Sequence, residues 1–98
     1  MVNQLVSRKM SQAATQAISG KLSPSDAAEK VAKVASRHDS TIEGLSYQRG
    51  ELGAIVDGSY VKLVNSNQTT DRNLGHFMTA MGQYVTPKTY KSLDEKVA

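Results

Sequence analysis

The 98-residue sequence lacks cysteine and tryptophan and contains a single phenylalanine. Without cysteine, the chain forms no disulfide, binds no metal through thiolates and has no cysteine nucleophile. Its apolar residues are mostly alanine and valine, so a chain of this length, expected to form one domain over residues 1–98, has a light core. A light core gains stability when it is shared with a partner or with copies of the same chain.

Long apolar runs are also missing. No stretch approaches the roughly 20 apolar residues that a membrane-spanning helix needs, and no apolar segment of a signal peptide follows the start. The sequence therefore predicts a protein that is not secreted, has no membrane partner and resides in the cytoplasm or within a virion.

Acidic residues are absent from the first 25 positions, which contain Arg8, Lys9 and Lys21. Residues 26–57 hold six acids against four bases, and the net charge of the whole chain is +3. This balance is compatible with an anionic partner but does not require one.

Two helices are predicted in the first part of the chain. Apolar residues recur at helical spacing over residues 3–19, and Gly20 follows as a natural terminating residue. Ser23 and Pro24 then form a strong start signal for a second helix, with Asp26 in its first turn. Because the linker is short and both helices are rich in alanine, we expect a closely packed antiparallel pair.

The next segment is predicted to form a third helix. Ser40 and Glu43 have the spacing of a capping box, and Ile42, Leu45 and Leu52 could line one side. Glycines within this segment weaken it. Two interpretations remain open for residues 50–65: a β-hairpin that turns at 57–58, which is an Asp-Gly pair, or a continuation of the helix. In both, the glycines shape the backbone, because no phosphate-binding loop motif is present.

The clearest helical pattern covers residues 71–85, and a last helix is expected after Pro87. The predicted fold class is therefore mainly α, a small bundle of four to five helices, with or without one short β-hairpin near residues 53–64. The apolar side of the helix over 71–85 is the predicted partner interface, formed by Leu74, Phe77, Met78, Met81, Tyr84 and Val85.

No reactive set of side chains is evident. The two histidines, His38 and His76, lie far apart in the sequence, and neither has a neighbouring nucleophile or metal-ligand pattern. We therefore predict that the protein is not an enzyme and has no catalytic residue, no bound metal and no cofactor.

One segment resembles a known DNA-binding motif. VAKVASRHDSTIEGLS, residues 31–46, is similar to the helix-turn-helix of repressors of the lactose-repressor (LacI) type in its spacing of apolar residues. In that motif the second helix enters the major groove. The resemblance implies a helix-turn-helix-like element over residues 27–48, although the turn, usually glycine and an apolar residue, is here Ser36–Arg37.

Two functions follow from these patterns. The leading hypothesis is a non-enzymatic assembly protein, of the virion-component or adaptor type, whose amphipathic helices pack against a protein partner or copies of itself. The alternative is a small basic DNA-binding protein or regulator. Its candidate nucleic-acid contacts are Arg8, Lys9, Lys21, Arg37, Thr41 and Arg49.

Overall fold

The computed structural model describes residues 3–65 and 71–86, which form helices and a β-sheet. The elements, in chain order, are α1 (Gln4–Ile18), α2 (Pro24–Arg37), β1 (Ile42–Gln48), β2 (Glu51–Val56), β3 (Ser59–Asn65) and α3 (Asp71–Gly82). The strands form an antiparallel sheet in the order β1-β2-β3. The fold is therefore α+β, and the predicted bundle of four to five helices is wrong.

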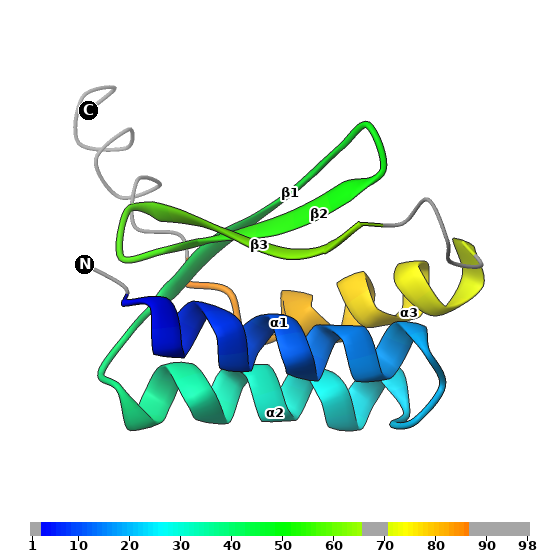
Figure 1. Ribbon diagram of the computed structural model, residues 1–98, viewed down its shortest axis with the longest axis horizontal. Helices are drawn as coiled ribbons and strands as arrows, with labels where there is room; N and C mark the ends of the chain where they lie inside the picture. Colours follow the sequence, from blue (N-terminus) through cyan, green and yellow to red (C-terminus); the bar gives the residue numbers. More distant parts are fainter. Residues whose placement is uncertain (1–2, 66–70, 87–98) are drawn as a thin grey trace, which may run out of the picture.

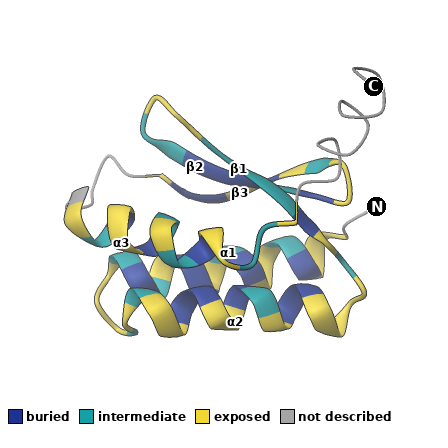
Figure 2. Ribbon diagram, turned by 180° about the vertical axis from the view of Figure 1, so that it is seen from behind, coloured by how far each residue is buried: buried dark blue, intermediate teal, exposed yellow. Residues whose placement is uncertain are grey.

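The elements are stacked in layers (Figure 1). Helices α1 and α3 lie next to each other beneath the sheet, and α2 packs against both on the side away from the sheet. Buried residues face one another between these layers, whereas the far side of α2 is exposed (Figure 2). One face of the sheet is thus covered by helices among the described residues.

The first two helices form as the sequence predicts. The side chain of Asn3 caps α1, and Ser23 Oγ accepts a hydrogen bond of 3.1 Å from the Asp26 amide at the start of α2. Gly20, with φ of +82°, ends the first helix in a conformation that favours glycine. Alanines fill the α1–α2 contact and let the two backbones approach closely, namely Ala13, Ala14, Ala17, Ala27, Ala28 and Ala35.

The third predicted helix is instead strand β1, so the helix-turn-helix interpretation of residues 27–48 is wrong. Glu43 does not cap a helix; its Oε1 accepts a 2.6 Å hydrogen bond from the backbone amide of Gly58, in the turn of the neighbouring hairpin. The Thr41 amide likewise donates to Asp57 Oδ1 at 2.9 Å. These contacts join residues that are distant in the sequence, and they stabilise a strand here. A helix in the same segment would be weakened by the glycines of the segment.

Two-residue turns connect the strands. The predicted turn at Asp57–Gly58 is confirmed, with φ of +51° and +80°, and the alternative of a continuous helix through residue 65 is wrong. A second turn, at Arg49–Gly50, has φ of +52° and +80°. The sequence did not predict this second turn, because arginine is not among the residues that favour positive φ.

A β-bulge changes which residues of β3 face outward. Simple alternation predicts that Tyr60, Lys62 and Val64 share a face. The register shifts between the pairs Leu52↔Val64 and Gly53↔Lys62, so an extra residue in β3 turns Val64 inward. Tyr60 and Lys62 remain exposed on the uncovered face, and Val64 is buried.

The apolar side of α3, predicted as a partner interface, faces the interior of the chain. Leu74, Phe77 and Met81 are buried in the core formed with the sheet and the other helices, and Met78, Tyr84 and Val85 are partly buried against it. The last predicted helix, expected after Pro87, lies outside the described residues.

Candidate nucleic-acid interface

A groove of about 720 Å³ runs between α1 and α2. Helical spacing places Arg8, Gln12 and Thr15 along one stripe of α1, and Lys30, Val34 and Arg37 along one stripe of α2. We call this the α1–α2 groove, and its lining residues are Arg8, Lys9, Ser11, Gln12, Thr15, Gln16, Lys30, Val34 and Arg37.

The groove is basic. Four of its lining residues, Arg8, Lys9, Lys30 and Arg37, are cationic and exposed, and none of the described side chains that line it is acidic. Lys30 Nζ donates to Gln16 Oε1 at 3.0 Å, which ties the two walls together with a neutral partner. The charges therefore add up along the groove instead of being neutralised within it.

The ion pair on α2 lies outside this groove. Lys33 Nζ is 3.0 Å from Glu29 Oε1, and both side chains are mostly exposed. Helical spacing places these two residues on a neighbouring stripe of α2. Lys33 is thus a cation on the same helix whose charge is locally compensated.

A second hollow continues from the groove toward the sheet. It has a volume of about 600 Å³, lies between α1 and β3, and shares Ser11 and Thr15 with the α1–α2 groove. Ser11 Oγ donates a 2.7 Å hydrogen bond to the Leu63 carbonyl, which joins the helix to the strand. On the sheet side this hollow is lined by residues that include Lys62 and Asn65.

A third hollow lies on the sheet and shares Asn65 with the second. Its volume is about 410 Å³, and it is lined by Ser46, Gln48, Arg49, Glu51, Tyr60 and Asn65. We call the α1–α2 groove, the α1–β3 hollow and this sheet hollow together the polar track. Side chains of the track are dominated by hydrogen-bonding and cationic groups, with Glu51 as the acid among its described lining residues.

Tyr60 is held against the sheet within this third hollow. The outer end of its ring lies over Gly53, at a place where any Cβ atom would collide with it. Its hydroxyl donates a 2.5 Å hydrogen bond to Glu51 Oε2, and Lys62 Nζ lies 3.7 Å from Glu51 Oε1. The hydrogen bond to Glu51, followed by desolvation and the charge of Glu51, raises the pKa of Tyr60 above its ordinary value of 10.0.

The structure brings four of the six predicted nucleic-acid contacts onto the polar track. Arg8, Lys9 and Arg37 line the α1–α2 groove, and Arg49 lines the sheet hollow. Lys21 lies in the loop between α1 and α2, and Thr41 precedes β1 with its amide bonded to Asp57.

Lys30 and Tyr60 are among the members of the track that sequence reasoning missed. Lys30 precedes Arg37 by two helical turns, so its spacing alone was a sufficient signal for a shared stripe. Tyr60 gave no such signal, because its position over Gly53 depends on the pairing of β2 with β3.

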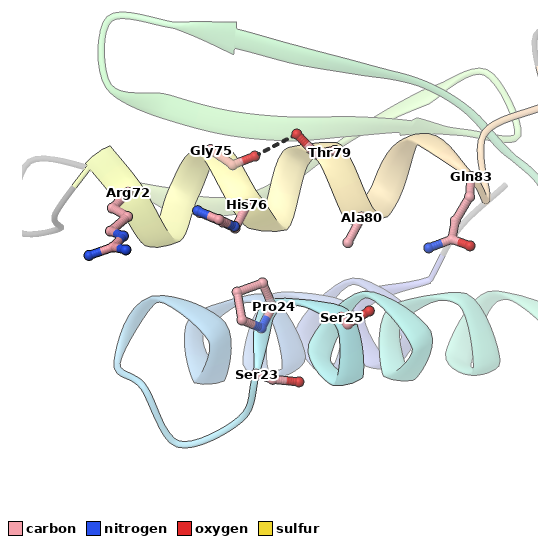
Figure 3. A pocket seen from close by; sticks show the side chains of 9 residues that line it. All are labelled: Ser23, Pro24, Ser25, Arg72, Gly75, His76, Thr79, Ala80 and Gln83. Atoms are coloured by element: carbon pink, nitrogen blue, oxygen red, sulfur yellow. Dashed lines mark hydrogen bonds between the residues drawn. The ribbon is translucent and has the colours of Figure 1, made fainter.

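Another hollow, of about 810 Å³, lies between α3 and the first turn of α2 (Figure 3). Arg72 and His76 extend from α3 toward the side of α2, and Gln83, just after the end of α3, lines the other end of the hollow. The hydrogen bond drawn there, 3.0 Å from Thr79 Oγ1 to the Gly75 carbonyl, lies within α3. Arg72 is the permanent cation of this lining, so the hollow carries less positive charge than the α1–α2 groove.

The histidines do not meet. His38 ends α2 as its capping residue, and His76 lies on α3 in the hollow of Figure 3. Within residues 3–65 and 71–86, no cluster of three or more histidine, cysteine or acidic residues could hold a metal ion. The same described part of the chain contains no helix of the length and apolar character needed to cross a membrane.

Comparison of the chain with protein-family models, curated protein sequences and solved structures finds no match.

Proposed function

We propose that the protein binds nucleic acid through the phosphate backbone, using the α1–α2 groove. The observation that carries this proposal is the convergence of Arg8, Lys9, Lys30 and Arg37 in one groove whose described lining includes no acid. Arginine and lysine neutralise phosphates and release bound counterions, which supplies affinity without reading sequence.

The other lining residues support the same function. Serine, threonine and glutamine side chains, which occupy the α1 wall between the cations, commonly donate hydrogen bonds to phosphate and sugar oxygens. The groove lies on regular helices, so its cations are presented in a fixed order along two antiparallel stripes.

The proposal is tested by measuring the affinity of labelled DNA by fluorescence anisotropy over a series of salt concentrations. The double variant Arg8→Ala/Arg37→Ala removes two exposed groove cations and should weaken binding at every salt concentration. The slope of log affinity against log salt should become shallower by roughly 0.7 to 0.9 per lost phosphate contact.

Lys33→Ala is the matched control. It removes one cation from the same helix, but this cation is paired with Glu29 outside the groove. Its affinity and salt slope should stay close to those of the unmodified protein. The single variants Arg8→Ala and Arg37→Ala each remove one cation, as Lys33→Ala does. Absence of DNA binding, or an equal loss of affinity for Lys33→Ala and for these two variants, would contradict the proposed function.

The self-association expected from the sequence stays a prediction. Its main argument was the set of apolar stripes, and the buried residues of α1, α2 and α3 contribute these stripes to the chain's own core. Light scattering on the purified chain measures the mass of the particle directly and tests this prediction separately from nucleic-acid binding.

A further inference from the structure

We infer that the bound nucleic acid is a single strand that follows the polar track from the α1–α2 groove over β3 and stacks a base on Tyr60. This inference rests on the proposed function and adds the class of nucleic acid and a second contact site. It is carried by two observations, the exposed aromatic ring on the sheet and the continuity of the track.

Tyr60 has the geometry of a stacking platform. Tyr60 is 50% exposed although the end of its ring lies over Gly53, so the ring is anchored on the sheet while half of the residue stays accessible. Any residue with a Cβ at position 53 would force the ring away from the sheet. A base has an apolar face of matching size, and stacking on an aromatic side chain is tolerant of base identity.

The polar groups around the ring hold it in place. Glu51 accepts the hydrogen bond from the Tyr60 hydroxyl. The ammonium group of Lys62 lies beside the same carboxylate and offsets the negative charge of Glu51. A tyrosine hydroxyl is protonated at neutral pH, and the raised pKa of Tyr60 extends this state to higher pH, so the hydroxyl continues to donate to Glu51. Arg49, in the same hollow, supplies a cation for a phosphate next to the stacked base.

The path from the groove to the ring is continuous. The shared residues Ser11 and Thr15 join the groove to the α1–β3 hollow, and Asn65 joins that hollow to the sheet. The path therefore leaves the helical layers and turns over an edge strand onto the outer face of the sheet. A duplex has a persistence length of about 50 nm and does not bend over so short a distance without a large cost, whereas a single strand does.

The test compares an oligothymidylate of about 12 nucleotides, within the site sizes usual for single-strand binding, with a duplex of equal length. The unmodified protein should bind the single strand more tightly. Tyr60→Ala should weaken single-strand binding by about tenfold or more, which is the usual effect of removing one stacking aromatic residue from a single-strand-binding protein. The same variant should leave duplex binding nearly unchanged. Tyr60→Phe, which keeps the ring, should retain most of the affinity.

Tyr47→Ala is the matched control, because Tyr47 is also an exposed tyrosine of the sheet, at 44%, but pairs with Leu52 on the other face. Gly53→Ala provides a second route, since it displaces the ring without removing it and should also weaken single-strand binding.

The inference fails if the duplex binds as tightly as the single strand, or if Tyr60→Ala and Tyr47→Ala have equal effects. In either case the proposed function still stands if the double variant of Arg8 and Arg37 loses affinity. If neither form of DNA binds, the proposed function itself fails.

Discussion

Gly53 and Tyr60 show how one missing side chain creates a surface feature. The ring of Tyr60 occupies the space that a Cβ on Gly53 would need, and the two residues are brought together by the pairing of β2 with β3. In this position the Tyr60 hydroxyl donates to Glu51, and half of the residue stays exposed to solvent.

At this scale we predict that Gly53→Ala lowers the pKa of Tyr60 toward 10.0, because the displaced hydroxyl loses its hydrogen bond to Glu51. Absorbance titration of tyrosine ionisation measures this change. Gly44→Ala, on the neighbouring strand with open space at its Cβ, should leave the titration unchanged. Equal titrations for the two variants would show that the contact does not set the pKa.

The raised pKa of Tyr60 also predicts how the stability of the folded state changes with pH. The folded state raises the pKa of Tyr60, so the protonated hydroxyl favours folding. Its contribution is complete below the unfolded value of 10.0 and is lost as the pH rises through the higher value of the folded state.

At the scale of elements, the two turns determine how neighbouring strands of the sheet are connected and twisted. Both connections in the described sheet place two successive residues at positive φ, and the second of each pair is glycine, Gly50 or Gly58. This turn geometry matches the twist of the strands it joins. In addition, Glu43 from β1 accepts a hydrogen bond from the amide of Gly58, so the turn between β2 and β3 also fixes the neighbouring strand.

We predict opposite effects for two glycine-to-alanine changes. Gly58→Ala places a Cβ on a backbone with φ of +80° and should lower the free energy of unfolding by about 1 kcal/mol. Gly75→Ala, in α3 with open space around the new Cβ, should raise it by up to about 1 kcal/mol, because alanine is the better helix former. Urea denaturation followed by circular dichroism measures both, and a stabilising Gly58→Ala would contradict the turn assignment.

At the scale of the whole molecule, one apolar core joins the layers. Phe77 and Met81 of α3, Met10 of α1 and Leu52 of β2 are all fully buried in it. The alanines of α1 and α2 add little volume, so the larger buried side chains, these four among them, fill most of the core.

The packing of the core predicts that two methionines of α3 lose different amounts of stability when each is replaced by alanine. Met81→Ala should destabilise the fold by about 2 to 5 kcal/mol, since Met81 is fully buried. Met78→Ala, at a partly buried position, should cost less. Thermal denaturation of the two variants compares them directly. If Met78→Ala were the more destabilising, the assignment of α3 to the interior in this orientation would be wrong.

Local sequence signals were sufficient where neighbours along the chain decide the structure. The spacing of apolar residues, Ser23 with Pro24, and Gly20 predicted α1 and α2 and their antiparallel pairing, because helices depend on contacts within a few residues. Local signals also indicated the Asp57–Gly58 turn, since its φ angles restrict the residues that fit, but they left a continuous helix open as the alternative. Arg8, Lys9 and Arg37 were named from the sequence as candidate nucleic-acid contacts, but no local signal grouped them in one groove.

Tertiary structure alone decided the rest. Residues 42–48 satisfy a helical pattern, but pairing with β2 and the hydrogen bonds of Thr41 and Glu43 to the next turn favour a strand. Antiparallel packing of α1 on α2 placed Lys30 and Arg37 in the same groove as Arg8 and Lys9, and strand pairing placed Tyr60 over Gly53. These contacts join residues far apart in the sequence, and no local pattern encodes them because each depends on where another element packs.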